Sequence, residues 1–172
     1  MVFSKVETIY FIHNLICSVF VRYTNSMKIE IDQSGKLENT NISTVVGFSN
    51  GKCKSIIIAS REKIRLQKHF RDIDKRMIYI YFTFSAMIYL LIKSERKIED
   101  IIIDTEYPGH EHLIKSYLIQ FFTKANKKIN KKRIYFRQIG HESNAHNVSI
   151  TSYRSKRADI RIKAEEIIKL LA

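Results

Sequence analysis

Three consecutive isoleucines, Ile101 to Ile103, constrain the possible folds of this chain more than any other feature. The run is too short for a helix, and it lacks the apolar–polar alternation of a strand with one face in water. Such uninterrupted apolar runs are typical of parallel strands that are buried on both faces. Because parallel strands need long crossover connections, usually helices, the run indicates an α/β domain.

The sequence before this run predicts three strands. Residues 27–36 alternate apolar and polar side chains, which is the pattern of a half-buried strand. Further strands are expected at 43–48 and 54–60, and between them Asn50-Gly51 is a strong hairpin signal.

The rest of the chain alternates helical and strand patterns. Residues 61–76 are charge-dense and fit either a strand extension or a short helix followed by a connection. The apolar run 77–92 fits a buried helix or a short membrane span, and its tyrosines, threonine and serine favour the buried helix. The remaining segments are predicted as a helix at 110–126, a strand at 134–139, a polar loop at 141–157 and a terminal amphipathic helix at 159–171.

The predicted order, β-β-β-α-β-α-β-α, implies a mixed five-stranded sheet flanked by helices in one domain over 27–172. Residues 1–26 are an apolar extension that is short for a membrane span and is followed by no Ala-x-Ala-like cleavage site. Translation from Met27, a poorly packed extension and a membrane anchor all remain open for this segment. Two cysteines are too few for a disulfide framework, and we expect a cytoplasmic protein without stable membrane insertion.

The net charge of +13 favours a polyanionic partner, either nucleic acid or an anionic membrane surface. A basic run at 127–133 could contact such a partner or be an ordinary solvated loop. The residues predicted to bind nucleic acid are Lys36, Lys127, Lys128, Lys131, Lys132 and Arg133.

Three acids occupy positions that suit a metal site. Asp32 lies near the end of the first strand, Asp104 ends the isoleucine strand, and Asp159 is expected to begin the last helix. Ligand sites of open α/β sheets gather at the carboxyl ends of the strands, so Asp32 and Asp104 would face one pocket if their strands are neighbours. Carboxylates that meet there would favour a hard divalent cation, Mg²⁺ or Mn²⁺. Two such ions can activate water and stabilise a leaving oxygen in phosphodiester hydrolysis.

The element order and these acids resemble the ribonuclease H-like superfamily of nucleases, resolvases and integrases. The string Ile-Ile-Ile-Asp104-Thr-Glu-Tyr107 is similar to the family's Thr-Asp-Ser-x-Tyr, and Gly140-His141-Glu-Ser-Asn144 is similar to its Gly-His-x-x-x-Asn loop. The resemblance covers about 27–172 and implies that Asp32, Asp104 and Asp159 hold the metal, while His141 assists proton transfer.

One position departs from the family pattern. The second acid of the family lies at the start of the first long helix, where this sequence has Ile78. Its replacement could come from Glu62, Asp72, Asp74 or, most attractively, Glu106, two residues after Asp104.

The leading expectation is a metal-dependent nuclease. A catalytically inactive module that binds nucleic acid or protein is the alternative, motivated by the missing helix acid, and a membrane-associated protein using 9–21 and 77–92 is a second alternative. His110-Glu-His112 and the pair His141 and His146 suggest zinc at first sight, but neither has the spacing of a standard zinc motif.

Overall fold

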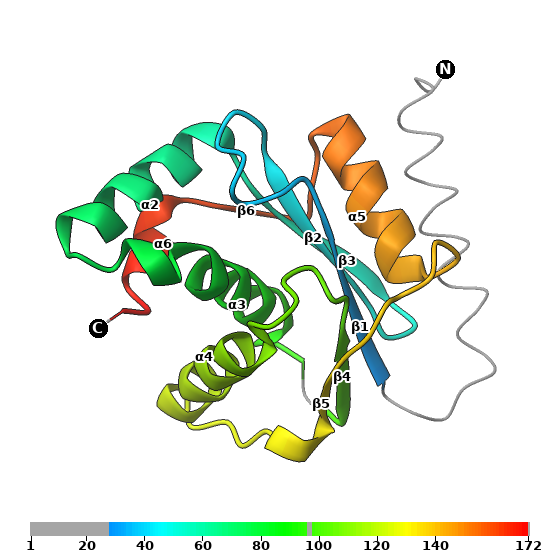
Figure 1. Cartoon of the computed structure of the whole chain (residues 1–172). Helices are drawn as coiled ribbons and strands as arrows, with labels where there is room; N and C mark the ends of the chain where they lie inside the picture. The colour runs from blue at the N-terminus through cyan, green and yellow to red at the C-terminus, as the bar shows by residue number, and fades with distance from the viewer. Residues whose placement is uncertain (1–27, 96–97, 172) are drawn as a thin grey trace.

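A computed structural model describes residues 28–95 and 98–171 (Figure 1). Its centre is a six-stranded mixed sheet in the order β5-β4-β1-β2-β3-β6. β1, β2 and β3 are antiparallel neighbours, whereas β4 and β5 run parallel to β1 on one side and β6 runs parallel to β3 on the other. The strands are β1 (Lys28–Ser34), β2 (Thr44–Ser49), β3 (Cys53–Ile58), β4 (Asp100–Ile103), β5 (Ile134–Phe136) and β6 (Ile160–Ile162).

Helices cover both faces of the sheet (Figure 1). One face carries α3 and α4, with α2 and α6 packed together toward the β6 edge, and the opposite face carries α5 across β1, β2 and β3. The α-helices are α2 (Ser60–Asp72), α3 (Tyr79–Ile92), α4 (Glu111–Lys124), α5 (Asn144–Ser155) and α6 (Ala164–Ile168), and the short 3₁₀ helices are η2 (Arg76–Ile78) and η3 (Lys131–Arg133).

The two faces of the sheet differ in chemistry because strand side chains alternate. In β1, Ile29 and Ile31 join the hydrophobic core beneath α3 and α4. Asp32 and Ser34 are also buried, but both contact Ser149 of α5 on the opposite face. The face under α5 is therefore the polar face, and it carries the candidate site.

Gly47 of β2 lets α5 approach this polar face closely. A Cβ at this position would lie 2.5 Å from the Ala145 carbonyl oxygen and 2.7 Å from the Ser149 backbone nitrogen. In register, Gly47 lies between Asp32 of β1 and Ser55 of β3. The absence of a side chain here places the helix directly over Asp32.

The prediction of an α/β domain with a mixed sheet and flanking helices is confirmed. The Asn50-Gly51 hairpin joins β2 and β3 as expected, with Gly51 at a φ of 89°. The charge-dense segment contains α2, and the apolar run contains α3, whose side chains are almost all buried within the domain.

Two predicted elements at the C-terminal end are wrong. Residues 141–157, expected as a loop, contain α5, because this helix packs through Ala145, Val148, Ser149 and Ser152 rather than through large apolar residues. Residues 159–171, expected as one helix, contain β6 and the short α6. The sheet therefore has six strands and not the predicted five.

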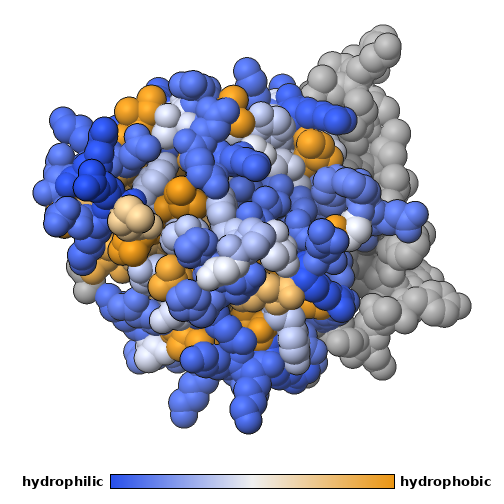
Figure 2. All heavy atoms as spheres, in the orientation of Figure 1, coloured by the Kyte–Doolittle hydropathy of each residue, from blue (hydrophilic) through white to orange (hydrophobic). Residues whose placement is uncertain are grey.

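Polar side chains cover most of the face shown in Figure 2, with small apolar patches between them. Among the described residues, the exposed large hydrophobic side chains are Ile64, Ile73, Met77 and Tyr135. Over 28–95 and 98–171, no helix has both the length and the apolar character needed to cross a bilayer. The predicted extension at 1–26 lies outside the described residues.

Candidate metal centre

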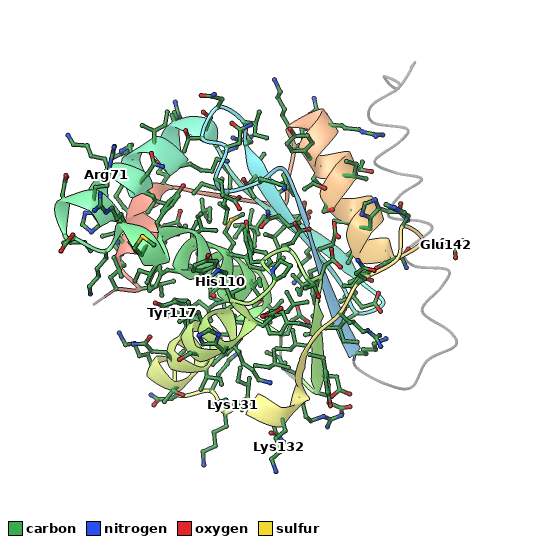
Figure 3. The ribbon with its side chains drawn as sticks, in the orientation of Figure 1. Arg71, His110, Tyr117, Lys131, Lys132 and Glu142 are labelled. Atoms are coloured by element: carbon green, nitrogen blue, oxygen red, sulfur yellow. The ribbon has the colours of Figure 1, made fainter. Side chains whose placement is uncertain are left out.

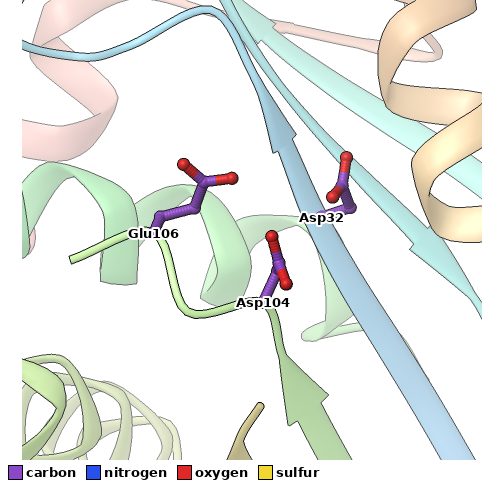
Figure 4. Close-up of side chains that lie close together, drawn as sticks. All are labelled: Asp32, Asp104 and Glu106. Atoms are coloured by element: carbon purple, nitrogen blue, oxygen red, sulfur yellow. The ribbon is translucent and has the colours of Figure 1, made fainter. Parts of the chain in front are cut away.

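Asp32, Asp104 and Glu106 converge at the carboxyl end of β1 and β4 (Figure 4). Each offers a carboxylate oxygen, and these oxygens all lie within 4.8 Å of one another. β1 and β4 are adjacent parallel strands, and the Asp104 N–H continues their pairing by donating to the Ile31 carbonyl at 2.9 Å. We call these three residues the acidic cluster.

A tight turn after β4 brings two of the carboxylates together. The Glu106 N–H donates to the Asp104 carbonyl oxygen at 2.9 Å, which folds the chain back after only two residues. Oδ1 of Asp104 in turn accepts the Ile139 N–H at 2.7 Å, so the segment after β5 holds this carboxylate in place.

Asp32 is the most buried member of the cluster, with 3% of its surface exposed. Burial raises the pKa of its carboxyl group above the ordinary value, and the nearby Asp104 raises it further. The Ser149 hydroxyl, which donates to Oδ2 of Asp32, opposes this shift, as does His146. Asp32 is therefore a buried carboxylate with two stabilising neighbours from α5.

Glu106 carries the largest perturbation of the cluster. Burial, together with the charges of Asp104 and Asp32 and a hydrogen bond to Asp104, raises its pKa to about 7, while Lys36 acts in the opposite direction. Three carboxylates in one partly buried place repel one another, and a bound proton relieves this repulsion when no cation does.

His146 is a site residue that the sequence did not predict. Its Nδ1 lies 3.5 Å from Oδ2 of Asp32. Its Nε2 lies 3.4 Å from Nδ1 of His141, and the two rings pack edge to face. His141, the predicted proton-transfer residue, is exposed and reaches Asp32 only through His146. His146 and Ser149 are three residues apart, so they lie on one face of α5. The sequence would have placed them together if it had predicted this helix.

Asp159 does not join the acidic cluster, although the sequence predicts it there. It precedes β6 and not the terminal helix, and its Oδ2 accepts the Ser55 N–H at 2.7 Å and the Ser55 hydroxyl at 3.1 Å. β3, which carries Ser55, is separated from β1 by β2, a distance of about 10 Å at ordinary strand spacing. Asp159 therefore cannot share one ion with Asp32 and Asp104.

The candidates to replace the acid that is missing at Ile78 also lie outside the cluster, except Glu106. Glu62 lies in the first turn of α2, but Oε2 of its carboxylate accepts the Ala164 N–H of α6 at 2.9 Å, and its neighbours are Arg61 and Arg65. Ile78 ends η2 and packs against the hydrophobic core. Of the candidates named for this role, Glu106 alone belongs to the cluster.

The predicted basic residues divide into two groups. Lys127 donates to the Lys93 and Glu95 carbonyls, and Arg133 forms two bonds to Asp100, of 2.7 and 2.9 Å. Lys128, Lys131 and Lys132 are exposed, and Figure 3 shows Lys131 and Lys132 pointing away from the fold. Apart from these, Lys36 lies close enough to the cluster to lower the pKa of Glu106.

Hydroxyl groups line the contact between α5 and the sheet. Ser149 bonds to Ser34 at 2.9 Å, in addition to Asp32. One turn later, Ser152 donates to Ser55 at 2.9 Å. These buried bonds fix the rotation of α5 and therefore the position of His146 beside Asp32.

The donor set fits a hard divalent cation. Its ligands are carboxylate oxygens from Asp32, Asp104 and Glu106, which suit Mg²⁺ or Mn²⁺, and the mutual repulsion of these groups would be relieved by positive charge. Comparison with known proteins gives no matching family model, no matching curated protein and no matching solved structure.

Proposed function

We propose that this protein is a divalent-metal-dependent nuclease with a ribonuclease H-like domain, which hydrolyses phosphodiester bonds in nucleic acid. The observation that supports the proposal best is the acidic cluster, because its three carboxylates meet at the ends of two adjacent parallel strands. Ligand sites in sheets of this kind gather at that edge. The net charge of +13 adds a reason for a polyanionic substrate.

The order of the elements supports the same proposal. Three antiparallel strands come first, and helices then alternate with β4 and β5, which is the order that underlies the resemblance. β6 is an addition at the far edge of the sheet. A cytoplasmic location remains a prediction.

Asp32, Asp104 and Glu106 would hold Mg²⁺ or Mn²⁺. Such an ion supplies Lewis-acid activation of water and stabilisation of the charge on the phosphate oxygens. Binding requires Glu106 to release the proton that its pKa of about 7 favours. The hydrogen bond that Ser149 donates to Asp32 lowers the pKa of this carboxyl group and so opposes the effect of burial.

The histidine pair provides a path for a proton. In hydrolysis, a bond forms between the water oxygen and phosphorus, the bond from phosphorus to the leaving oxygen breaks, and the water gives up a proton. His146, beside Asp32, can accept that proton and pass it to the exposed His141. The leaving oxygen then takes a proton from solvent.

The test is cleavage of labelled single-stranded and duplex DNA and RNA by the full chain with Mg²⁺, Mn²⁺ or EDTA. We expect metal-dependent cleavage, and we expect Asp104→Asn to reduce its rate at least about 100-fold. Mutating a residue that only supports a metal ligand costs up to about 100-fold in activity, and mutating the ligand itself should cost at least as much. Asp159→Asn is the matched control, because Asp159 lies outside the acidic cluster, and it should cleave like the wild type. Equal losses in both variants, or no metal-dependent cleavage by the wild type, would refute the proposal.

One observation favours the second candidate, a catalytically inactive module that binds nucleic acid. The resemblance implies more acids than the cluster contains, since neither Asp159 nor the Ile78 position contributes one. This candidate predicts salt-sensitive binding of nucleic acid that is unaffected by EDTA, with no cleavage.

A further inference from the structure

Strand β5 and the residues on either side of it carry a row of three side chains at the edge of the sheet. Ile134 and Phe136 both face the hydrophobic core, on the side of the sheet opposite to the polar face. By strand alternation, Tyr135 projects from the other face, and so does Arg137, which continues the pairing with β4 just after the strand. Arg133 is the last residue of η3, and its guanidinium forms two bonds to Asp100 of β4. Tyr135 is 46% exposed on this edge strand, and Arg137 is also exposed. We call Arg133, Tyr135 and Arg137 the β5 strip.

The β5 strip ends beside the acidic cluster. The Arg137 N–H donates to the Ile103 carbonyl at 3.2 Å, one residue before Asp104. Tyr135 is opposite Ile102 in the parallel pairing, so its backbone lies about 8 Å from that of Asp104 at ordinary strand spacing and rise. At the other end, Arg133 follows Lys131 and Lys132 of η3. The strip thus connects the exposed basic turn to the three carboxylates.

The side chains of the strip are suited to a nucleic-acid strand. In the described part of the chain, the Arg137 guanidinium forms no hydrogen bond or ion pair, so it is available for a phosphate. Tyr135 offers an aromatic ring on which a base could stack, and Arg133 lies next to it, held by Asp100. An arginine–tyrosine–arginine row of this kind complements phosphates and an unpaired base together.

A polypeptide strand that pairs with the edge of β5 fits this surface less well. The Nζ of Lys115, from α4, donates to the Ile134 carbonyl at 2.8 Å. This bond occupies a backbone acceptor of the edge strand, and a lysine at a strand edge opposes the addition of another strand.

We propose that a single strand of nucleic acid lies along β5, with one base stacked on Tyr135 and a phosphate bound by Arg137, and that this places a neighbouring phosphodiester at the acidic cluster. The inference rests on the proposed function, since it names the form of nucleic acid that the site takes. Single-stranded substrate follows from Tyr135, because an exposed ring can stack only on a base that is not paired within a duplex.

The experiment measures binding of fluorescent oligothymidylate, oligouridylate and a duplex to the full chain by fluorescence anisotropy. Asp104→Asn serves as the background, so that cleavage does not interfere. We expect Tyr135→Ala and Arg137→Gln each to weaken single-strand binding about tenfold. Tyr135→Phe should bind within about twofold of the background, because it keeps the ring. The two oligonucleotides distinguish DNA from RNA as the source of the strand.

Arg71→Gln is the matched control, because Arg71 is exposed at a distant part of the surface and its loss changes the net charge equally (Figure 3). Arg137→Gln should lower the slope of log affinity against log salt by about 1, and Arg71→Gln should not. Equal weakening by both variants, or tighter binding of the duplex than of the single strands, would overturn the inference.

The two proposals fail separately. If the wild type cleaves with metal while the Tyr135 and Arg137 variants bind and cleave like it, the β5 strip is refuted and the nuclease proposal stands. If single-strand binding depends on Tyr135 and Arg137 but no metal-dependent cleavage occurs, the strip stands and the nuclease proposal is refuted.

Discussion

In the absence of a cation, a proton on Glu106 relieves the repulsion within the acidic cluster. Its pKa of about 7 lies above the ordinary value of 4.5 because Glu106 is partly buried beside Asp104 and Asp32. The folded protein therefore binds this proton more tightly than the unfolded chain does. The stability that it contributes is complete below pH 4.5 and is lost as the pH rises through 7.

We expect Glu106→Gln to stabilise the metal-free protein by about 1 to 2 kcal/mol at pH 8. At this pH the Glu106 carboxylate is ionised and is repelled by Asp104 and Asp32 in the folded protein, and glutamine removes this repulsion. At a pH below 4.5 the two proteins should have nearly equal free energies of unfolding, since Glu106 is then protonated in both the folded and the unfolded state. Urea denaturation in EDTA measures both. Glu142→Gln, a change on an exposed loop side chain, is the control and should show no such pH-dependent gain.

The sequence predicts individual acids well only where local strand patterns locate them. Asp32 and Asp104 follow apolar strand residues, so the edge of the sheet at which they lie could be inferred. Glu106 is only two residues after Asp104 and could be placed near the same edge. Asp159 follows no such pattern, and its place depends on the pairing of β6 with β3, two strands away from β1. His146 and Ser149 are found only when α5 is known to lie over Asp32.

At the scale of elements, α5 determines the environment of Asp32. This helix contacts β1, β2 and β3, but its buried residues are two serines, an alanine and one valine: Ala145, Val148, Ser149 and Ser152. Its position depends on the shape of the sheet, and above all on Gly47, more than on a large apolar surface.

Gly47→Ala should therefore displace α5 and destabilise the protein by about 2 to 3 kcal/mol, because the new methyl group would meet the helix backbone. Since a shifted helix moves Ser149 and His146 away from Asp32, metal-dependent cleavage should fall as well. Gly140→Ala is the control, because a Cβ there meets nothing within 4 Å. Thermal unfolding and the cleavage assay give the two readouts, and an unchanged Gly47→Ala would contradict this role for α5.

The same feature explains why this part of the fold could not be predicted. Helical prediction relies on large apolar residues at helical spacing, and α5 buries serines and an alanine at those positions. In β6, Ile160, Arg161 and Ile162 alternate over three residues only, too few to be distinguished from the start of the helix that follows. α3, α4 and the hairpin were predictable because their apolar patterns are long or their turn is specific.

For the molecule as a whole, the acidic cluster joins parts of the chain that are distant in sequence. Asp32 comes from β1, Asp104 and Glu106 follow β4, and the supporting groups come from α5 and the segment after β5. A ligand that bridges the carboxylates would bind the folded state and not the unfolded chain, in which these residues are far apart. Binding would therefore stabilise the complete domain.

We expect Mn²⁺ to raise the melting temperature of the full chain, by an amount that grows with the ratio of free Mn²⁺ to its dissociation constant. The rise should be larger at pH 8 than at pH 6, because binding has to displace the Glu106 proton below its pKa of about 7. Differential scanning fluorimetry with and without Mn²⁺ measures the effect. Asp104→Asn should abolish the rise at both pH values, whereas Asp159→Asn should keep it, because Asp159 bonds to Ser55 outside the cluster. A rise of equal size in both variants would mean that the ion binds elsewhere.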